Sequence, residues 1–163
     1  AAPIVGLEPS CLMTLRDEFI ALVPGEATRA VADRAFLLTE FLHERKPALA
    51  LKPLDRTAHV HGHCHQKAFG AFPAAVATLK TIPGLTVKPI ASSCCGMAGS
   101  FGYEAQNQEV SRAMANLSLI PAVLAAPAGD LILAEGTSCR HQIADLAKRE
   151  ALHPIRILDM ALA

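Results

Sequence analysis

The chain has 163 residues, of which 52% are hydrophobic and 18% are charged, and its formal net charge at pH 7 is zero. This length and composition predict one compact domain with a substantial core, and they exclude a disordered chain. Neither basic nor acidic residues form a run, so the charge pattern gives no reason to expect a nucleic acid or a membrane surface as partner.

The apolar stretches and the first residues bear on the compartment of the protein. No stretch reaches the roughly 18 uninterrupted apolar residues of a membrane span, and Ala1 begins the chain without a start methionine or the segments of a secretory signal. We therefore expect a piece of a longer cytoplasmic protein. If it lies at the inner membrane, we expect partners to hold it there. Five cysteines in such a chain indicate a reducing compartment, where clustered thiols more often bind metal or carry out redox chemistry than form disulfides.

The hydrophobic pattern alternates between short apolar runs and longer amphipathic stretches. The short runs predict buried strands, whereas apolar residues at three- and four-residue intervals predict helices. In chain order we expect a strand at 3–8, helices at about 12–23 and 27–43, a strand at 57–62, a helix at 72–79, a strand at 85–90, a helix at about 103–124 that Pro121 kinks or restarts, a strand at 130–135, a helix at about 139–149 and a short helix after Pro154.

Strands that alternate with helices imply right-handed crossovers and a parallel sheet. We predict an α/β fold, Rossmann-like or flavodoxin-like, with a four-stranded parallel sheet and helices on both faces. The carboxyl ends of parallel strands lie along one edge of a sheet, so residues that follow the strands are expected to meet there. A cysteine motif follows each expected strand, with thiols at Cys11, at Cys64, at the pair Cys94 and Cys95, and at Cys139.

The adjacent cysteines Cys94 and Cys95 reach one metal centre only if the chain turns sharply, because neighbouring side chains of an extended chain point to opposite faces. Gly96, Gly99 and Gly102 permit such a turn and a close approach of backbone N–H groups. Soft thiolates without a cluster of acidic residues favour zinc, copper(I) or iron-sulfur over calcium or magnesium. The alternative is that the cysteines are ordinary small buried residues, which four cysteine-bearing strand ends make less favoured.

Histidines precede and follow Cys64. His59, His61, His63 and His65 alternate, so they share one face of the expected strand. His63 and His65 are candidates to bind a cofactor, to orient a ligand or to move protons, and the alternative is a ring that is satisfied by a backbone carbonyl. We expect His59 and His61 to serve packing.

Charged residues also flank the expected site. Arg140 and Lys67 can hold thiolates or an anionic substrate, or they can be solvated side chains at helix starts. Glu8 and Glu135 are expected to cap neighbouring backbone amides, with proton transfer as the alternative. The glycines of residues 96–102 lack the dinucleotide-binding spacing, so this segment is not expected to bind FAD or NAD.

Three segments resemble a known family: residues 63–67 (HCHQK), 94–104 (CCGMAGSFGYE) and 136–143 (GTSCRHQI). They are similar to the cysteine-rich CCG domain of heterodisulfide reductase, of the iron-sulfur subunits of glycolate oxidase and anaerobic glycerol-3-phosphate dehydrogenase, and of the C-terminal region of FAD-linked oxidases. The resemblance to the last group, the FAD/FMN-containing dehydrogenases, is closest, and it runs from about Val5 to the end of the chain.

The resemblance implies a duplicated domain. The single domain at 1–163 would hold the end of a first half, 1–45, and a complete second half, 46–163; the similar stretches at 8–11 and 135–139 agree with this. It also implies a set of site residues. The ligands of a 4Fe-4S cluster would be Cys64, Cys94, Cys95 and Cys139, with Cys11 as the last ligand of the preceding half, and the residues expected to line the cofactor are His63, His65, Gly96, Gly99 and Arg140.

One position departs from the family pattern, because Gly136 stands where the closing Cys-x-x-Cys has its first cysteine. Four thiolates are enough for a 4Fe-4S cubane or a tetrahedral zinc site, and an aerobic preparation is expected to lose the cluster or to hold zinc. The resemblance implies an electron-transfer module of a flavin-dependent oxidoreductase that oxidises a 2-hydroxy acid of the D-lactate, D-2-hydroxyglutarate or glycolate type. Its partners would be upstream FAD and ferredoxin-like domains. A zinc-stabilised docking domain and a thiol/disulfide redox catalyst are the alternatives.

Overall fold

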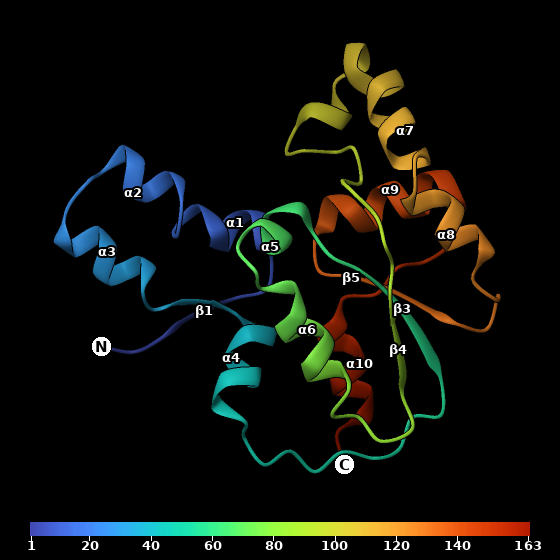
Figure 1. Ribbon diagram of the computed structural model, residues 1–163, viewed down its shortest axis with the longest axis horizontal. Coiled ribbons are helices and arrows are strands. Elements are labelled where there is room, and N and C mark those ends of the chain that lie inside the picture. Colours follow the sequence, from blue (N-terminus) through green and yellow to red (C-terminus); the bar gives the residue numbers. More distant parts are fainter.

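The computed structural model describes residues 1–163, and strands and helices alternate along the chain (Figure 1). The elements in chain order are β1 (Ile4–Gly6), α1 (Pro9–Thr14), α2 (Glu18–Leu22), α3 (Glu26–Ala32), β2 (Ala35–Leu37), α4 (Leu38–Arg45), β3 (Thr57–His61), α5 (Cys64–Ala68), α6 (Phe72–Leu79), β4 (Thr86–Pro89), the 3-10 turns η1 (Phe101–Tyr103) and η2 (Ala105–Asn107), α7 (Gln108–Asn116), α8 (Leu119–Ala125), β5 (Leu131–Ala134), α9 (Thr137–Ala147) and α10 (Pro154–Ala161).

The larger sheet has three parallel strands in the order β4-β3-β5. His59 in the central strand lies opposite Lys88 of β4 and Ile132 of β5. Since the three strands run the same way, the chain leaves all of them at the same edge of the sheet. This edge carries the segments that hold four of the five cysteines.

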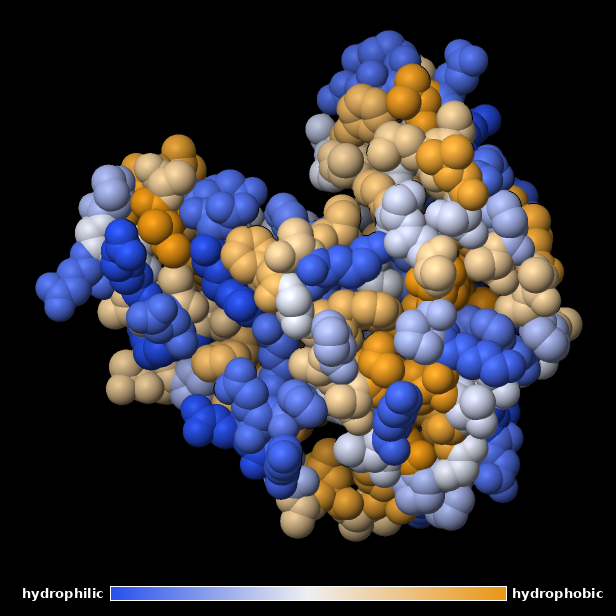
Figure 2. Space-filling model, in the orientation of Figure 1, coloured by the Kyte–Doolittle hydropathy of each residue, from blue (hydrophilic) through white to orange (hydrophobic).

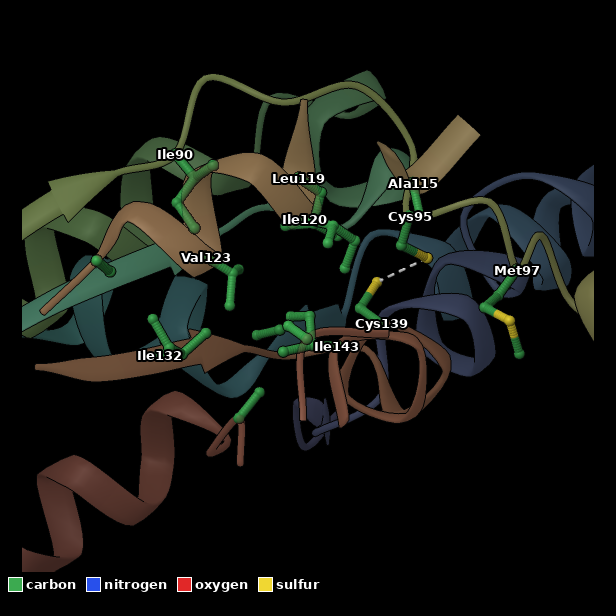
Figure 3. Packing of buried hydrophobic residues seen from close by; sticks show 14 residues of the cluster. Ile90, Cys95, Met97, Ala115, Leu119, Ile120, Val123, Ile132, Cys139 and Ile143 are labelled. Atoms are coloured by element: carbon green, nitrogen blue, oxygen red, sulfur yellow. Dashed lines mark hydrogen bonds between the residues drawn. The ribbon is translucent and has the colours of Figure 1, made fainter. Parts of the chain in front are cut away.

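Helices cover both faces of this sheet, as predicted. Side chains alternate along β5, so that Ile132 and Ala134 pack with α8 and α9 on one face, whereas Leu133 packs with α6 and α10 on the other. Strands that are buried on both faces read as continuous apolar runs, which explains why β5 was the clearest strand in the sequence. Figure 3 shows the first of these clusters.

The predicted four-stranded sheet is wrong. All four predicted strands form, but β1 lies apart from the other three and pairs in parallel with β2, with Val5 opposite Phe36. The sequence pattern assigned β2 to the middle of a helix, because a three-residue strand fits within apolar residues spaced three and four apart. The chain restarts as α4 after Leu37, where the Glu40 carboxylate accepts the Leu37 N–H at 3.0 Å and so caps the new helix.

Other predicted helices are divided more finely than expected. The helix expected at about 12–23 is α1 and α2, and the one expected at about 103–124 is η1, η2, α7 and α8. Pro121 falls in the first turn of α8, where its missing N–H leaves no intrahelical hydrogen bond unmade, so the helix restarts there rather than kinking. The short α5 was not predicted.

The N-terminal elements form a lobe of their own. Leu12 and Met13 of α1 pack on Ala35 and Leu37 of β2, while α2 has no buried residue. Within this N-terminal lobe, α2 and α3 project from the rest of the chain (Figure 1). Apolar side chains lie among hydrophilic ones on the surface of this part (Figure 2). The division into an end of a first half and a complete second half stays a prediction.

No helix of the structure combines the length and the apolar character that crossing a membrane requires.

Candidate metal centre

Four cysteines lie together at the carboxyl edge of the larger sheet. Cys64 begins α5 just after β3, Cys94 and Cys95 lie in the loop after β4, and Cys139 lies in the first turn of α9 after β5. The Cys64 and Cys94 sulfurs are 4.0 Å apart. The Cys95 and Cys139 sulfurs are 3.3 Å apart, and Figure 3 shows this pair. Thiols that follow three different strands therefore form two close pairs, which the adjacent residues Cys94 and Cys95 connect, and none of the thiols is in a disulfide.

The group has a buried end and an outer end. Cys95 and Cys139 are 2% and 1% exposed and belong to the apolar cluster of α7, α8 and α9. Cys64 and Cys94 are only partly buried. The buried end is thus shielded from water, while the outer end lies near the protein surface.

The turn at the adjacent cysteines depends on Gly96. Its φ is +88°, and a Cβ at this position would overlap the Ser111 carbonyl oxygen and lie 2.9 Å from the carbonyl carbon, so both the backbone conformation and the lack of space require glycine. The Gly96 N–H donates to the Cys94 sulfur at 3.3 Å. Gly99 also has a positive φ, +66°, but nothing lies near its Cβ position, so only the backbone conformation favours glycine there.

Lys67 fixes the loop that leads to these cysteines. Its amino group, on α5, donates to the carbonyl oxygens of Ser92 and Ser93 at 2.7 and 2.8 Å. Arg140 likewise donates to the backbone, to the carbonyl oxygens of Ala134 and Glu135 at the end of β5. Neither cation has a hydrogen bond to a thiol, and the predicted place of Arg140 at the cofactor stays a prediction.

The hydrogen bond within each pair of thiols favours the thiolate form of one member of the pair. The hydrogen bond with Cys64 is the main reason that the pKa of Cys94 is lowered, and the hydrogen bond with Cys95 lowers the pKa of Cys139 to about 5. The same hydrogen bonds, together with burial, raise the pKa of Cys64 and Cys95, which keep their protons. Thiolates are the metal-binding form, and a buried thiolate without a cationic side chain is costly unless a metal ion compensates its charge.

His63 lies next to Cys139. It is buried, and its Nδ1 accepts the His65 N–H at 3.3 Å as the N-cap of α5, while burial lowers its pKa. A Cβ on Gly136 would lie 2.5 Å from the His63 ring and 3.1 Å from the Cys139 sulfur. Glycine at 136 therefore leaves the space that the His63 ring uses beside the thiol.

The side chains of His65 and Cys11 have no hydrogen bond to the four thiols. A nitrogen of His65 groups with carboxylate oxygens of Asp17 and Glu18, all within 4.8 Å of one another. Cys11 is exposed on α1, and no hydrogen bond joins its thiol to another cysteine. The roles predicted for these two residues stay predictions.

His61 is the residue that sequence reasoning missed. It ends β3, is 1% exposed, and offers a ring nitrogen that lies within 4.8 Å of the Cys95 and Cys139 sulfurs, which are themselves within that distance of each other. Packing was expected for it because it lies within the predicted strand, whereas His63 and His65 lie beyond the end of that strand beside Cys64. The usable signal was the strand end, since the last residue of a central parallel strand lies at the ligand-binding edge.

The two glutamates that end strands have different partners. Glu8 accepts the Thr137 N–H and hydroxyl, both at 2.8 Å, so it caps the start of α9, and the capping role is confirmed. Glu135 is 3% exposed and instead accepts the Thr39 hydroxyl at 2.7 Å, and its burial raises its pKa to about 7. Both contacts tie the N-terminal lobe and α4 to the edge that carries the thiols.

The donor set fits metals that prefer sulfur. Thiolates with an imidazole nearby are ligands of zinc and of iron-sulfur clusters. Neighbouring sulfurs on one tetrahedral ion are about 3.8 Å apart when each metal–sulfur bond is about 2.3 Å. The observed separations of 3.3 and 4.0 Å bracket that value.

Sequence comparison relates the chain to parts of known dehydrogenases. It is 28% identical over 164 residues to one subunit of the anaerobic glycerol-3-phosphate dehydrogenase of Escherichia coli K12, an alignment that covers 99% of this chain and 41% of that protein. It is 32% identical over 160 residues to D-2-hydroxyglutarate dehydrogenase of Pseudomonas putida and 31% identical over 161 residues to the Escherichia coli K12 protein of that name, each covering 96% of this chain and 15% of the relative.

The chain therefore spans less than half the length of these relatives. No protein-family model matches it, and no solved structure matches it. The chain is similar to one portion of larger dehydrogenases.

Proposed function

We propose that this chain is a CCG-type iron-sulfur electron-transfer module of a flavin-dependent dehydrogenase. The observation that carries the proposal is the meeting of four thiols from three strand ends, with sulfur separations of 4.0 Å for Cys64 and Cys94 and 3.3 Å for Cys95 and Cys139. Similarity over nearly the whole chain to two kinds of dehydrogenase supports a redox role. The partners would be FAD and ferredoxin-like domains, and the substrate of the whole protein a 2-hydroxy acid.

In this proposal the four cysteines hold a 4Fe-4S cluster, which when bound accepts and gives up single electrons. The Gly96 N–H, 3.3 Å from the Cys94 sulfur, stabilises negative charge on that ligand. The apolar residues around Cys95 and Cys139 exclude water from the buried end. A partner domain can approach the outer end, where Cys64 and Cys94 are partly exposed. Substrate turnover belongs to the other domains.

Anaerobic purification of the full chain tests this proposal. We expect a brown protein that contains iron and acid-labile sulfide and that shows an electron paramagnetic resonance signal after reduction. Cys139→Ser should lose the iron, whereas Cys11→Ser, which removes an exposed thiol with no cysteine partner, is the matched control and should keep it. A colourless protein without iron after anaerobic reconstitution would refute the proposal.

The sulfur separations also favour a second candidate, a zinc site that stabilises a docking domain. The separation within each pair, 3.3 and 4.0 Å, is close to that of two sulfurs on one tetrahedral ion, and the two pairs would move closer together to share it. In that case metal analysis should find about one zinc per chain, and a chelator should lower the temperature of unfolding. Iron with equimolar sulfide instead of zinc would exclude this candidate.

A further inference from the structure

We propose that His61 supplies a nitrogen ligand to the metal centre, next to the thiolates of Cys95 and Cys139, so that the centre has mixed nitrogen and sulfur donors. The inference rests on the metal-binding role proposed above, but it concerns a residue outside the cysteine motifs. A His61 ring nitrogen and the two sulfurs lie within 4.8 Å of one another.

One ring nitrogen of His61 has no partner in the protein. The residue is 1% exposed, and its buried Nε2 makes no hydrogen bond. A buried polar atom left without a partner costs about 1–3 kcal/mol, so such atoms are rare unless something else satisfies them. His59 and His153, by contrast, use their Nε2 atoms on the Asp130 carboxylate and the Leu7 carbonyl oxygen. A metal ion at the thiols would satisfy the His61 nitrogen.

The other ring nitrogen is held in the way that a metal ligand needs. His61 Nδ1 lies 2.7 Å from the Ser92 hydroxyl oxygen, and Lys67 holds the Ser92 carbonyl at 2.7 Å. When the Ser92 oxygen accepts the Nδ1 proton, the lone pair is on Nε2 and is free to bind a cation. Metal-binding histidines are oriented by such a hydrogen bond from the second ring nitrogen.

The topology places the three donors around one point. His61 ends the central strand β3, Cys95 follows the neighbouring strand β4, and Cys139 follows the other neighbour, β5. Each strand of the sheet thus supplies one donor at its carboxyl end, with the imidazole in the middle. All three residues are buried, which excludes water as a competing ligand at this end of the centre.

An imidazole at position 61, instead of a further thiolate there, changes the electronic properties of the centre. A neutral nitrogen ligand gives the centre less negative charge than a thiolate at the same position would, and histidine ligation raises the reduction potential of iron-sulfur centres. We therefore expect the potential of the wild-type centre to be higher than that of a His61→Cys variant.

Cobalt(II) alone is the probe, because it occupies zinc and iron sites and reports its ligands by spectroscopy. In the reduced full chain under anaerobic conditions, we expect a thiolate-to-cobalt absorption band and, in pulsed electron paramagnetic resonance, a strong nitrogen coupling that changes when histidine is labelled with ¹⁵N. His61→Ala should lose the nitrogen coupling and bind cobalt on the order of 10-fold more weakly. Added imidazole should restore the coupling.

His59→Ala is the matched control, since it removes a histidine from the same strand face that is bonded to Asp130, and it should keep both signals. His61→Gln, which keeps a polar group, serves if the alanine variant fails to fold. Cobalt bound by thiolates with no histidine coupling in the wild type, or with an unchanged coupling in His61→Ala or His61→Gln, would overturn this inference and leave the metal-binding role intact. Failure of the reduced wild type to bind cobalt at all would overturn the metal-binding role itself.

Discussion

Replacing Gly96 by alanine tests how the structure turns two adjacent thiols toward one centre. Gly96 combines a φ of +88° with a backbone contact that leaves no room for a Cβ, since this atom would overlap the Ser111 carbonyl oxygen. Gly99 offers the matched control. Its φ of +66° is also positive, but nothing lies within 4 Å of its Cβ position.

The two substitutions separate the conformational cost from the contact cost. Gly99→Ala should destabilise the protein by about 1–2 kcal/mol, which is the cost of placing a side chain in the left-handed region. Gly96→Ala has that cost and must in addition displace the Ser111 backbone or the loop itself, so we expect a total of about 3 kcal/mol or more. The displaced loop would also move the Cys94 and Cys95 thiols.

Urea unfolding of both variants in reducing buffer measures these costs, and binding of cobalt(II) measures the position of the thiols. Gly96→Ala should lose most of its metal affinity, whereas Gly99→Ala should bind as the wild type does. Equal losses of stability in the two variants, or normal metal binding by Gly96→Ala, would refute the proposed role of the close contact.

Three further predictions concern residues around the same edge. Burial raises the pKa of Glu135 from 4.5 to about 7, so the folded wild type binds this proton more tightly than the unfolded chain does and loses stability as the pH rises through this range. Glu135→Gln in the metal-free protein should therefore raise the free energy of unfolding by about 3 kcal/mol at pH 8. At pH 4.5 the increase should be less than about 0.5 kcal/mol. A pH-independent difference in urea unfolding would contradict this assignment. Glu8→Ala should lower the free energy of unfolding by about 1 kcal/mol, because the start of α9 loses its cap at Thr137. A calorimetric melting temperature equal to that of the wild type would show that the cap contributes nothing. Lys67→Met should free the carbonyls of Ser92 and Ser93 and so speed alkylation of Cys94 in the reduced protein, as measured by mass spectrometry, while an unchanged rate would mean that the loop is held by other contacts.

Much of the fold follows from local sequence patterns, and the departures have local causes. β5 was predicted because a buried parallel strand is a continuous apolar run, whereas β3 was predicted from its alternating pattern and β4 from the apolar residues that follow the Pro83-Gly84 turn. β2 was missed because it has only three residues, Ala35–Leu37, and because Ala35 and Leu38 also fit the three- and four-residue spacing of a helix face. Whether β1 joins the other strands depends on long-range pairing, and hydrophobic periodicity carries no information about that.

The candidate site was predictable to the extent that it depends on topology. Cysteines that follow parallel strands meet at one edge, so the grouping of Cys64, Cys94, Cys95 and Cys139 followed from their places in the sequence. The position of the His61 ring beside two of the thiols did not follow from the sequence. The orientation of this ring depends on a hydrogen bond to Ser92, a residue 31 positions away in the loop after the next strand. Arg140 was expected at the cofactor for its charge. In the structure it donates hydrogen bonds to carbonyl groups at the end of β5, and its role at a cofactor stays a prediction.

X-ray absorption at the metal edge of the anaerobically purified full chain tests the central claim most directly, because it counts the sulfur atoms around the metal. Convergence of the thiols predicts sulfur neighbours at about 2.3 Å, together with one nitrogen neighbour at about 2.0–2.1 Å. A protein that retains no metal, or a metal surrounded by oxygen atoms alone, would contradict the account.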